Sequence, residues 1–210
     1  MLNEEKEQQK KKQIHRIAQI VLAGIAIVCI LYLVVHTVRQ AMIQRQYEQM
    51  SQESVVVQAE VTEQIEAQIY GPVPKVDFDT LWQTNEDICA WIYIPDTKVS
   101  YPVLRKQDAE NPYDDYYLSH TAEGQNGLPG SIYVEPCNAG DFSDNNTVVY
   151  GHHMKNGTMF GSLHEYQDES YMEKHPYVYV ITPERERVYQ VFAAIAYDDR
   201  RLMGSFASFT

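Results

Sequence analysis

The sequence has few cysteines. It holds three in 210 residues, Cys29, Cys89 and Cys137, and none of them belongs to a CxxC or metal-type spacing. The scarcity excludes a disulfide-rich scaffold and a cysteine-ligated zinc centre, and we expect neither a metal nor a cofactor. A disulfide between Cys89 and Cys137 is possible on count alone, although Cys89 lies in an apolar, strand-like run where a buried free thiol is typical.

Positive charge is scarce as well. The chain carries 17 Lys and Arg against 29 Asp and Glu, a net charge of −12. Five of the basic and three of the acidic residues lie in the first 16 positions, so the remainder has a net charge of −14 with histidine neutral. A surface this acidic repels phosphate groups, which excludes nucleic acid as a partner.

One long apolar run is present at residues 17–38. It contains no Asp, Glu, Lys or Arg over about 22 residues, enough to cross a hydrocarbon core of roughly 30 Å. Its length favours an uncleaved membrane anchor over a signal peptide. Five basic residues precede the run, whereas only Arg39 and Arg45 follow it closely, which predicts a cytoplasmic tail at 1–16 and an extracellular remainder.

After the run, residues 39–75 are rich in Gln and Glu and are expected to form a helical stalk or linker. Apolar residues recur there every four positions, a spacing typical of one stripe of a helix that docks on a domain or spaces it from the membrane. The stripe consists of Val57, Val61, Ile65 and Ile69. Gly71-Pro72-Val73-Pro74 then ends the helical pattern, so the folded domain is predicted at 76–210.

The pattern of the domain is mostly β with short helices. Trp91–Ile94 and Val99–Leu104 read as strands joined by a Pro95–Lys98 turn, which is a hairpin signal. A helix is predicted from Met159 to Tyr171. Four further strands are predicted, at Ser131–Val134, Thr147–Tyr150, Tyr177–Ile181 and Val188–Ala196.

The most informative segment is the strand Thr147–Tyr150 with the Gly151-His152-His153 that follows. It predicts that His152 sits at the rim of a sheet, where an imidazole can exchange protons near neutral pH. His153 points the other way in an extended strand and is interpreted as structural. Alternatives for His152 are a hydrogen-bonded structural histidine, or a metal site with His164 and a carboxylate, although that spacing matches no standard ligand pattern.

Several segments, in their order and spacing over about 80 residues, resemble the sortases, class B in particular. The segments are Asn85 through Pro95, Val99-Ser100-Tyr101-Pro102-Val103, Tyr116-Tyr117-Leu118, Gly130-Ser131-Ile132-Tyr133-Val134 and Asn146 through Leu163. The predicted anchor with its cytoplasmic amino terminus fits this family too. The resemblance implies a membrane-bound cysteine transpeptidase of Gram-positive bacteria built on an eight-stranded β-barrel.

In that family a cysteine attacks a sorting signal on a secreted protein, and an amine of cell-wall peptide or of a pilin resolves the thioester. The resemblance assigns to His152 the protonation of the departing amine and the deprotonation of the incoming one. It places Tyr150 beside the substrate groove. Asn111 is also assigned to substrate binding, although extra residues separate it from Tyr116-Tyr117-Leu118.

The sequence departs from the family after His152. The Thr-Leu-x-Thr-Cys motif with the nucleophile, and the later arginine, are absent, and neither Cys89 nor Cys137 occupies that position. We therefore expect a barrel with about six of its eight strands, truncated before these motifs and inactive as given. The alternatives are a non-catalytic, membrane-tethered module that binds sorting signals and a structural protein of the envelope.

Overall fold

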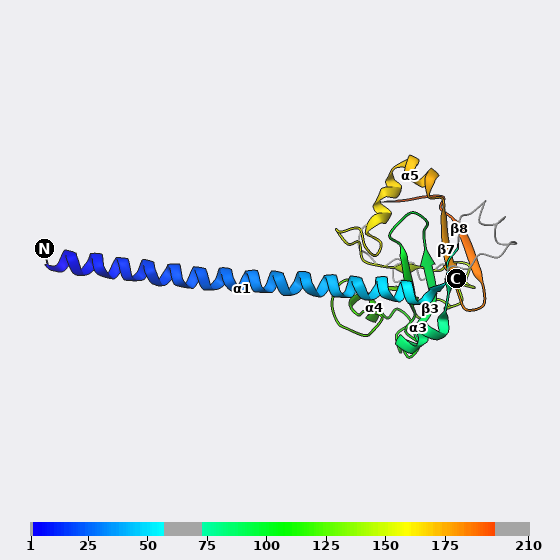
Figure 1. The fold of residues 1–210 in the computed structure, drawn as a ribbon, viewed down its shortest axis with the longest axis horizontal. Coiled ribbons are helices and arrows are strands. Elements are labelled where there is room, and N and C mark those ends of the chain that lie inside the picture. Colours follow the sequence, from blue (N-terminus) through cyan, green and yellow to red (C-terminus); the bar gives the residue numbers. More distant parts are fainter. Residues whose placement is uncertain (1, 57–72, 196–210) are drawn as a thin grey trace. The chain divides into compact units, whose positions relative to one another are not determined.

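The computed structural model describes residues 2–56 and 73–195 (Figure 1). The chain divides into two compact units, residues 1–44 and 45–210. Helix α1 (Leu2–Ser54) runs without a break from the first unit into the second. The apolar stripe predicted at Val57, Val61, Ile65 and Ile69 lies outside the described residues, and the predicted domain boundaries stay predictions.

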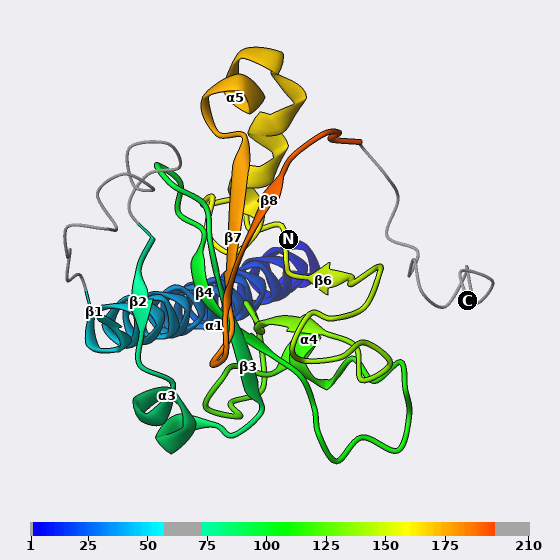
Figure 2. The same cartoon turned by 90° about the vertical axis from the view of Figure 1, so that its right-hand side faces the viewer.

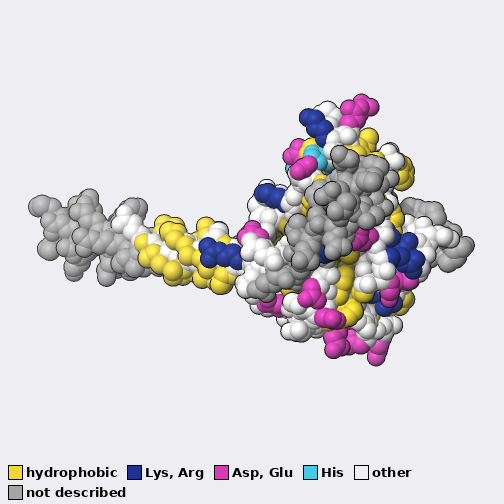
Figure 3. All heavy atoms as spheres, turned by 45° about the vertical axis from the view of Figure 1, so that its right-hand side comes forward, with side chains coloured by type: hydrophobic (Ala, Val, Ile, Leu, Met, Phe, Trp, Pro, Cys, Tyr) yellow, Lys and Arg dark blue, Asp and Glu magenta, His cyan; other side chains and the backbone are white. Residues whose placement is uncertain are grey.

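In the first unit, α1 contains an apolar segment long enough to cross a membrane. Its most apolar 18-residue window, within Leu22–Gln52, has a mean hydropathy of 2.1 and is not buried by other parts of the protein. Figure 3 shows this part of the helix as a band of hydrophobic side chains. The hydroxyl of Thr37 in this helix donates back to the carbonyl of Leu33 at 3.0 Å, which pairs its hydrogen within the helix.

The second unit is built on a six-stranded sheet in the order β6-β5-β4-β3-β7-β8 (Figure 2). All neighbouring strands are antiparallel except β4 and β5. The strands are β3 (Ile88–Tyr93), β4 (Ser100–Leu104), β5 (Ile132–Val134), β6 (Val149–Tyr150), β7 (Tyr177–Ile181) and β8 (Glu186–Gln190). The prediction of a mostly β domain is confirmed, and the predicted hairpin is the β3–β4 pair.

Short elements surround the sheet. They are β1 (Val55–Val56) paired with β2 (Lys75–Val76), α3 (Phe78–Thr84), α4 (Tyr116–Ser119), the 3-10 helix η1 (Gly161–Gln167) and α5 (Glu169–Lys174). The single helix predicted at Met159–Tyr171 is wrong in detail. Asp168 has an extended backbone and its carboxylate accepts from Ser170 N, so it starts α5 and separates it from η1.

The core lies on the central strands β3 and β4. Trp91, Val103 and Leu104 are fully buried there, as is Tyr179 on β7. The indole of Trp91 donates to the hydroxyl of Ser100 at 3.2 Å, which satisfies its N–H inside the core.

The strand pairings relate the end of β6 to the start of β3. Tyr133 of β5 pairs with Tyr150 of β6, so the chain leaves β6 at the end where β5 begins. Tyr133 also pairs with Leu104 at the end of β4, and Leu104 pairs with Ile88 at the start of β3. The end of β6 and the start of β3 are therefore separated across the sheet, with β5 and β4 between them.

Candidate functional site

His152 follows edge strand β6 and is held by a backbone carbonyl. Its Nε2 lies 2.7 Å from the carbonyl oxygen of Leu118, in α4. A carbonyl oxygen only accepts, so Nε2 carries the proton and donates it, which leaves the Nδ1 lone pair for proton exchange. His152 is half-buried.

The backbone around His152 is fixed by close packing. A side chain at Gly151 would collide with Ile132 and would come within 2.8 Å of the Phe160 ring, so a larger residue there would have to displace these two side chains. The amide of Phe160 donates to the carbonyl of His152 at 3.1 Å. The glycine in the Tyr-Gly-His order thus allows the chain after β6 to pack closely against the segment before η1.

His153 faces away from this arrangement. It is exposed, forms an isolated bridge with Met159, and its ring stacks on His164 at 5.4 Å between centroids. The structure pairs His164 with His153 rather than with His152. Within the described ranges, no group of three or more His, Cys, Asp and Glu could hold a metal ion.

Tyr150 lies two residues before His152 and packs along the sheet. Its ring stacks on Tyr133 with centroids 5.3 Å apart, and its hydroxyl lies 3.5 Å from a carboxylate oxygen of the buried Glu135. The ring is half-buried. Its assignment to the substrate groove stays a prediction.

Asn111 is not brought together with His152. Its side-chain oxygen accepts from the amide of Tyr113 in an exposed turn. The next residue, Pro112, accepts from the amide of Cys137, which follows the far end of β5. Its assignment to substrate binding also stays a prediction, one that no contact to the histidine supports.

The two thiols of the second unit, Cys89 and Cys137, are both free. Burial raises the pKa of the Cys89 thiol to about 12, and its Sγ donates to the carbonyl of Val103. Burial and the neighbouring Glu135 also raise the pKa of Cys137. An activated cysteine nucleophile has a lowered pKa, so neither thiol has the environment that nucleophilic attack needs.

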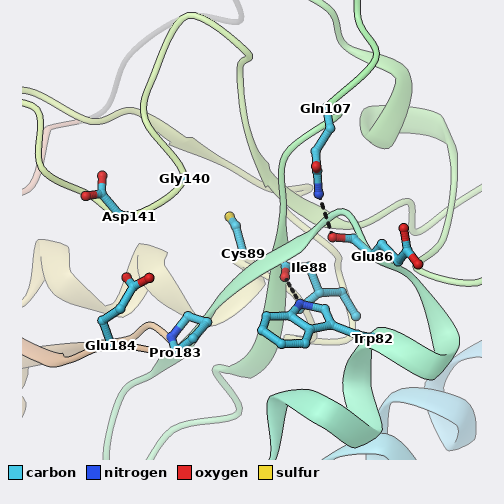
Figure 4. A pocket seen from close by; sticks show the side chains of 9 residues that line it. All are labelled: Trp82, Glu86, Ile88, Cys89, Gln107, Gly140, Asp141, Pro183 and Glu184. Carbon is cyan, nitrogen blue, oxygen red and sulfur yellow. Dashed lines mark hydrogen bonds between the residues drawn. The ribbon is translucent and has the colours of Figure 1, made fainter.

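Cys89 also lies in the wrong place to act with His152. It projects into a pocket of about 420 Å³ at the start of β3 (Figure 4). The pocket is lined by Trp82, Glu86, Ile88, Cys89, Gln107, Gly140, Asp141, Pro183 and Glu184. His152 follows β6, three strand spacings away in the sheet order, or on the order of 10 Å or more.

The charged residues that line the pocket are acidic, and two arginines lie near one of them, Asp141. Hydrogen bonds from Ser143, and then Arg185 and Arg187, lower the pKa of the Asp141 carboxyl. Arg185 lies 3.7 Å from that carboxylate in an exposed pair, which contributes little to stability. The indole of Trp82 donates to the carbonyl of Ile88 at 2.8 Å and fixes one wall.

Sequence reasoning missed the partner of His152. The bond is made to a backbone carbonyl, which every residue has, so no residue type signals it. It also passed over Tyr47, an aromatic residue among the Gln and Glu of α1 that proves to be buried against the domain. That contrast in polarity is the one signal in the sequence that could have identified it.

Comparisons with known proteins agree with the motifs. A model of the sortase domain family matches residues 92–207, more than half of the chain. Sortase B of Listeria monocytogenes is 38% identical over 96 residues, covering 46% of this chain and 37% of that protein. Sortase B of Staphylococcus aureus is 32% identical over 117 residues, covering 56% and 46%. The chain thus spans less than half the length of these curated relatives.

Solved structures show the same fold. A Staphylococcus aureus sortase B–substrate complex superposes with a TM-score of 0.58 at 26% identity, covering 74% of this chain and 66% of that one. A sortase B from B. anthracis gives a TM-score of 0.57 at 28% identity, covering 74% and 69%.

Proposed function

Because this chain belongs to the sortase family, and within it to class B, we propose that its His152 site serves a sortase-type transpeptidase. The reaction cleaves a sorting signal on a secreted protein and joins that protein to an amine of cell-wall peptide or of a pilin. One solved neighbour is a sortase B bound to a substrate, which supports this substrate class. The proposal includes one membrane span with the amino terminus in the cytoplasm, which the apolar segment of α1 and the basic residues before it support.

The observation that carries the proposal is the bond from His152 Nε2 to Leu118 O. It holds the ring by one nitrogen and leaves Nδ1 to move a proton. In thioester formation, Nδ1 takes the proton of the cysteine thiol and then gives it to the departing amine, while the cysteine sulfur replaces that amine on the carbonyl carbon. In the second half, Nδ1 takes a proton from the incoming amine, which displaces the sulfur and forms the new amide.

The sulfur in this scheme is neither Cys89 nor Cys137, because both have raised pKa values and both lie away from His152. The 210 residues by themselves are therefore proposed to be inactive. The same observation favours a second candidate function, a membrane-tethered module that binds sorting signals without cleaving them.

The test extends the chain at Thr210 with the part of Staphylococcus aureus sortase B that follows its matched region. We expect the extended protein to cleave a sorting-signal peptide, and His152→Ala to slow cleavage by about 10² to 10⁴-fold. His153→Ala, which changes the exposed neighbouring ring, is the matched control and should retain activity. An equally active His152→Ala protein would contradict the assignment.

The unextended chain separates the two candidate functions. Binding of the peptide without cleavage, together with an inactive extension, supports the binding module. Cleavage by the 210 residues that is lost in a Cys89→Ser, Cys137→Ser double variant would show that one of these thiols is the nucleophile after all.

A further inference from the structure

Tyr47, near the carboxyl end of α1, is buried against the loop between α4 and β5. Only 4% of its surface is exposed. Its hydroxyl donates to the carbonyl of Gly130 at 2.8 Å and accepts from the amide of Ala122 at 3.3 Å. It also lies 3.1 Å from the hydroxyl of Ser131. The hydroxyl of Tyr47 thus contacts both ends of the loop between α4 and β5, Ala122 at one end and Gly130 and Ser131 at the other.

That loop packs against the part of α4 that holds the imidazole of His152. The amide of Ser131 donates to the carbonyl of Tyr117 at 2.9 Å, and the next carbonyl, that of Leu118, accepts from His152. Gly130 has a φ of +63°, and a side chain there would collide with the Leu118 carbonyl. The backbone that Tyr47 binds is therefore in direct contact with the carbonyl that orients the histidine.

A second path reaches the backbone of His152. The ring of Tyr47 meets the ring of Tyr101 edge to face, with centroids 5.7 Å apart. The hydroxyl of Tyr101 accepts from the amide of Met159 at 3.0 Å, and the following amide, Phe160 N, donates to the carbonyl of His152. Both the ring nitrogen and the main chain of the histidine are thus connected to Tyr47.

The hydroxyl of Tyr47 keeps its proton at and well above neutral pH. Burial raises the pKa of Tyr47 to about 12, so it remains a donor to Gly130 well above neutral pH. The neighbouring contact from Gln46 to Glu123, at 2.7 Å, is exposed and contributes little by comparison.

From these contacts we infer that Tyr47 is a positioning residue for His152. The end of the anchor helix is then part of the support for the histidine as well as a connection to the membrane. This inference rests on the proposed acid/base role of His152. A purely structural role, in which Tyr47 only fixes α1 to the domain, predicts a change in stability with no change at the imidazole.

The test is Tyr47→Phe in the full 210-residue chain in detergent micelles, followed by nitrogen-15 NMR of the histidine side chains. Phenylalanine keeps the ring contact with Tyr101 and removes only the hydroxyl. We expect the Nε2 proton of His152 to exchange with water about three- to tenfold faster, as the loss of one ordinary hydrogen bond predicts, with less of the Nε2–H tautomer. Tyr189→Phe, on an exposed position of β8, is the matched control and should change neither signal.

An unchanged His152 signal in a folded Tyr47→Phe protein would overturn the inference. Should Tyr47→Phe not fold, Ser131→Ala removes a neighbouring contact of the same loop and is expected to speed the exchange in the same direction. An unchanged signal there would overturn the inference equally. The readout needs no peptide cleavage, so a failure of the proposed transpeptidation would leave a positive result on Tyr47 in place.

Discussion

The Nε2 atom of His152 donates to the carbonyl oxygen of Leu118 at 2.7 Å, joining the second residue after β6 to the short helix α4. The two residues are 34 positions apart, and no side chain of Leu118 takes part. The consequence is a histidine whose tautomer is set by the main chain, with Nδ1 left for proton transfer.

This bond predicts the tautomer of the neutral ring. We expect nitrogen-15 NMR to show the proton on Nε2 and an unprotonated Nδ1 once the ring is neutral. Leu118→Ala should leave that pattern in place, because alanine keeps the carbonyl. A predominant Nδ1–H form would contradict the arrangement.

Gly130 and Gly124 offer a paired test of the loop. Both have positive φ, +63° and +76°, so alanine at either position costs about 1 to 2 kcal/mol of backbone strain. Only at Gly130 would the new side chain collide with the Leu118 carbonyl, whereas it meets nothing at Gly124. Gly130→Ala is expected to lower the free energy of unfolding by about 1 to 3 kcal/mol more than Gly124→Ala.

Urea unfolding of both variants measures this difference. The His152 side-chain signals should move in Gly130→Ala and stay in place in Gly124→Ala. Equal losses of stability would mean that the loop yields easily, and Leu118 would then be a poor support for the histidine.

The sequence indicates some parts of this architecture and is silent on others. The β3–β4 hairpin was predictable because the apolar runs are separated by a Pro95–Lys98 turn. The break between η1 and α5 at Asp168 was not predictable, because the spacing typical of a helix continues across it. The capping role of Asp168 is recognised only from its extended backbone.

The candidate site also contains residues that the sequence predicts and residues that it does not. His152 was predictable because its strand, glycine and polar turn form a local pattern. Leu118 lies 34 positions before His152 in the sequence, and Tyr47 lies about 100 positions before it. A contact between such distant segments produces no periodic pattern in a single sequence.

Cys89 and Cys137 should differ sharply toward iodoacetamide. With a pKa of about 12, only about 1 in 10⁴ of the Cys89 thiols is ionised at pH 8. We expect alkylation at least about 100-fold slower than in the urea-unfolded chain, rising about tenfold with each pH unit because the thiolate fraction does so. Cys137 is exposed and should react faster than Cys89.

Peptide mapping by mass spectrometry after timed reactions resolves the two sites, with the unfolded chain as the reference for equal access. Fast modification of Cys89 at neutral pH would indicate a lowered pKa. Such a result would make Cys89 a candidate nucleophile in the pocket at the start of β3.

The exposed Cys137 also reports on the orientation of the anchor. Basic residues crowd the amino-terminal side of the apolar run, which predicts that the second unit lies outside the cell. A membrane-impermeant maleimide at pH 8 should therefore label intact cells that express the chain, and Cys137→Ser should abolish the signal. In that background, a Gln13→Cys variant should be labelled only after the membrane is permeabilised. Labelling in the reverse order would place the domain in the cytoplasm, where no secreted protein could reach His152.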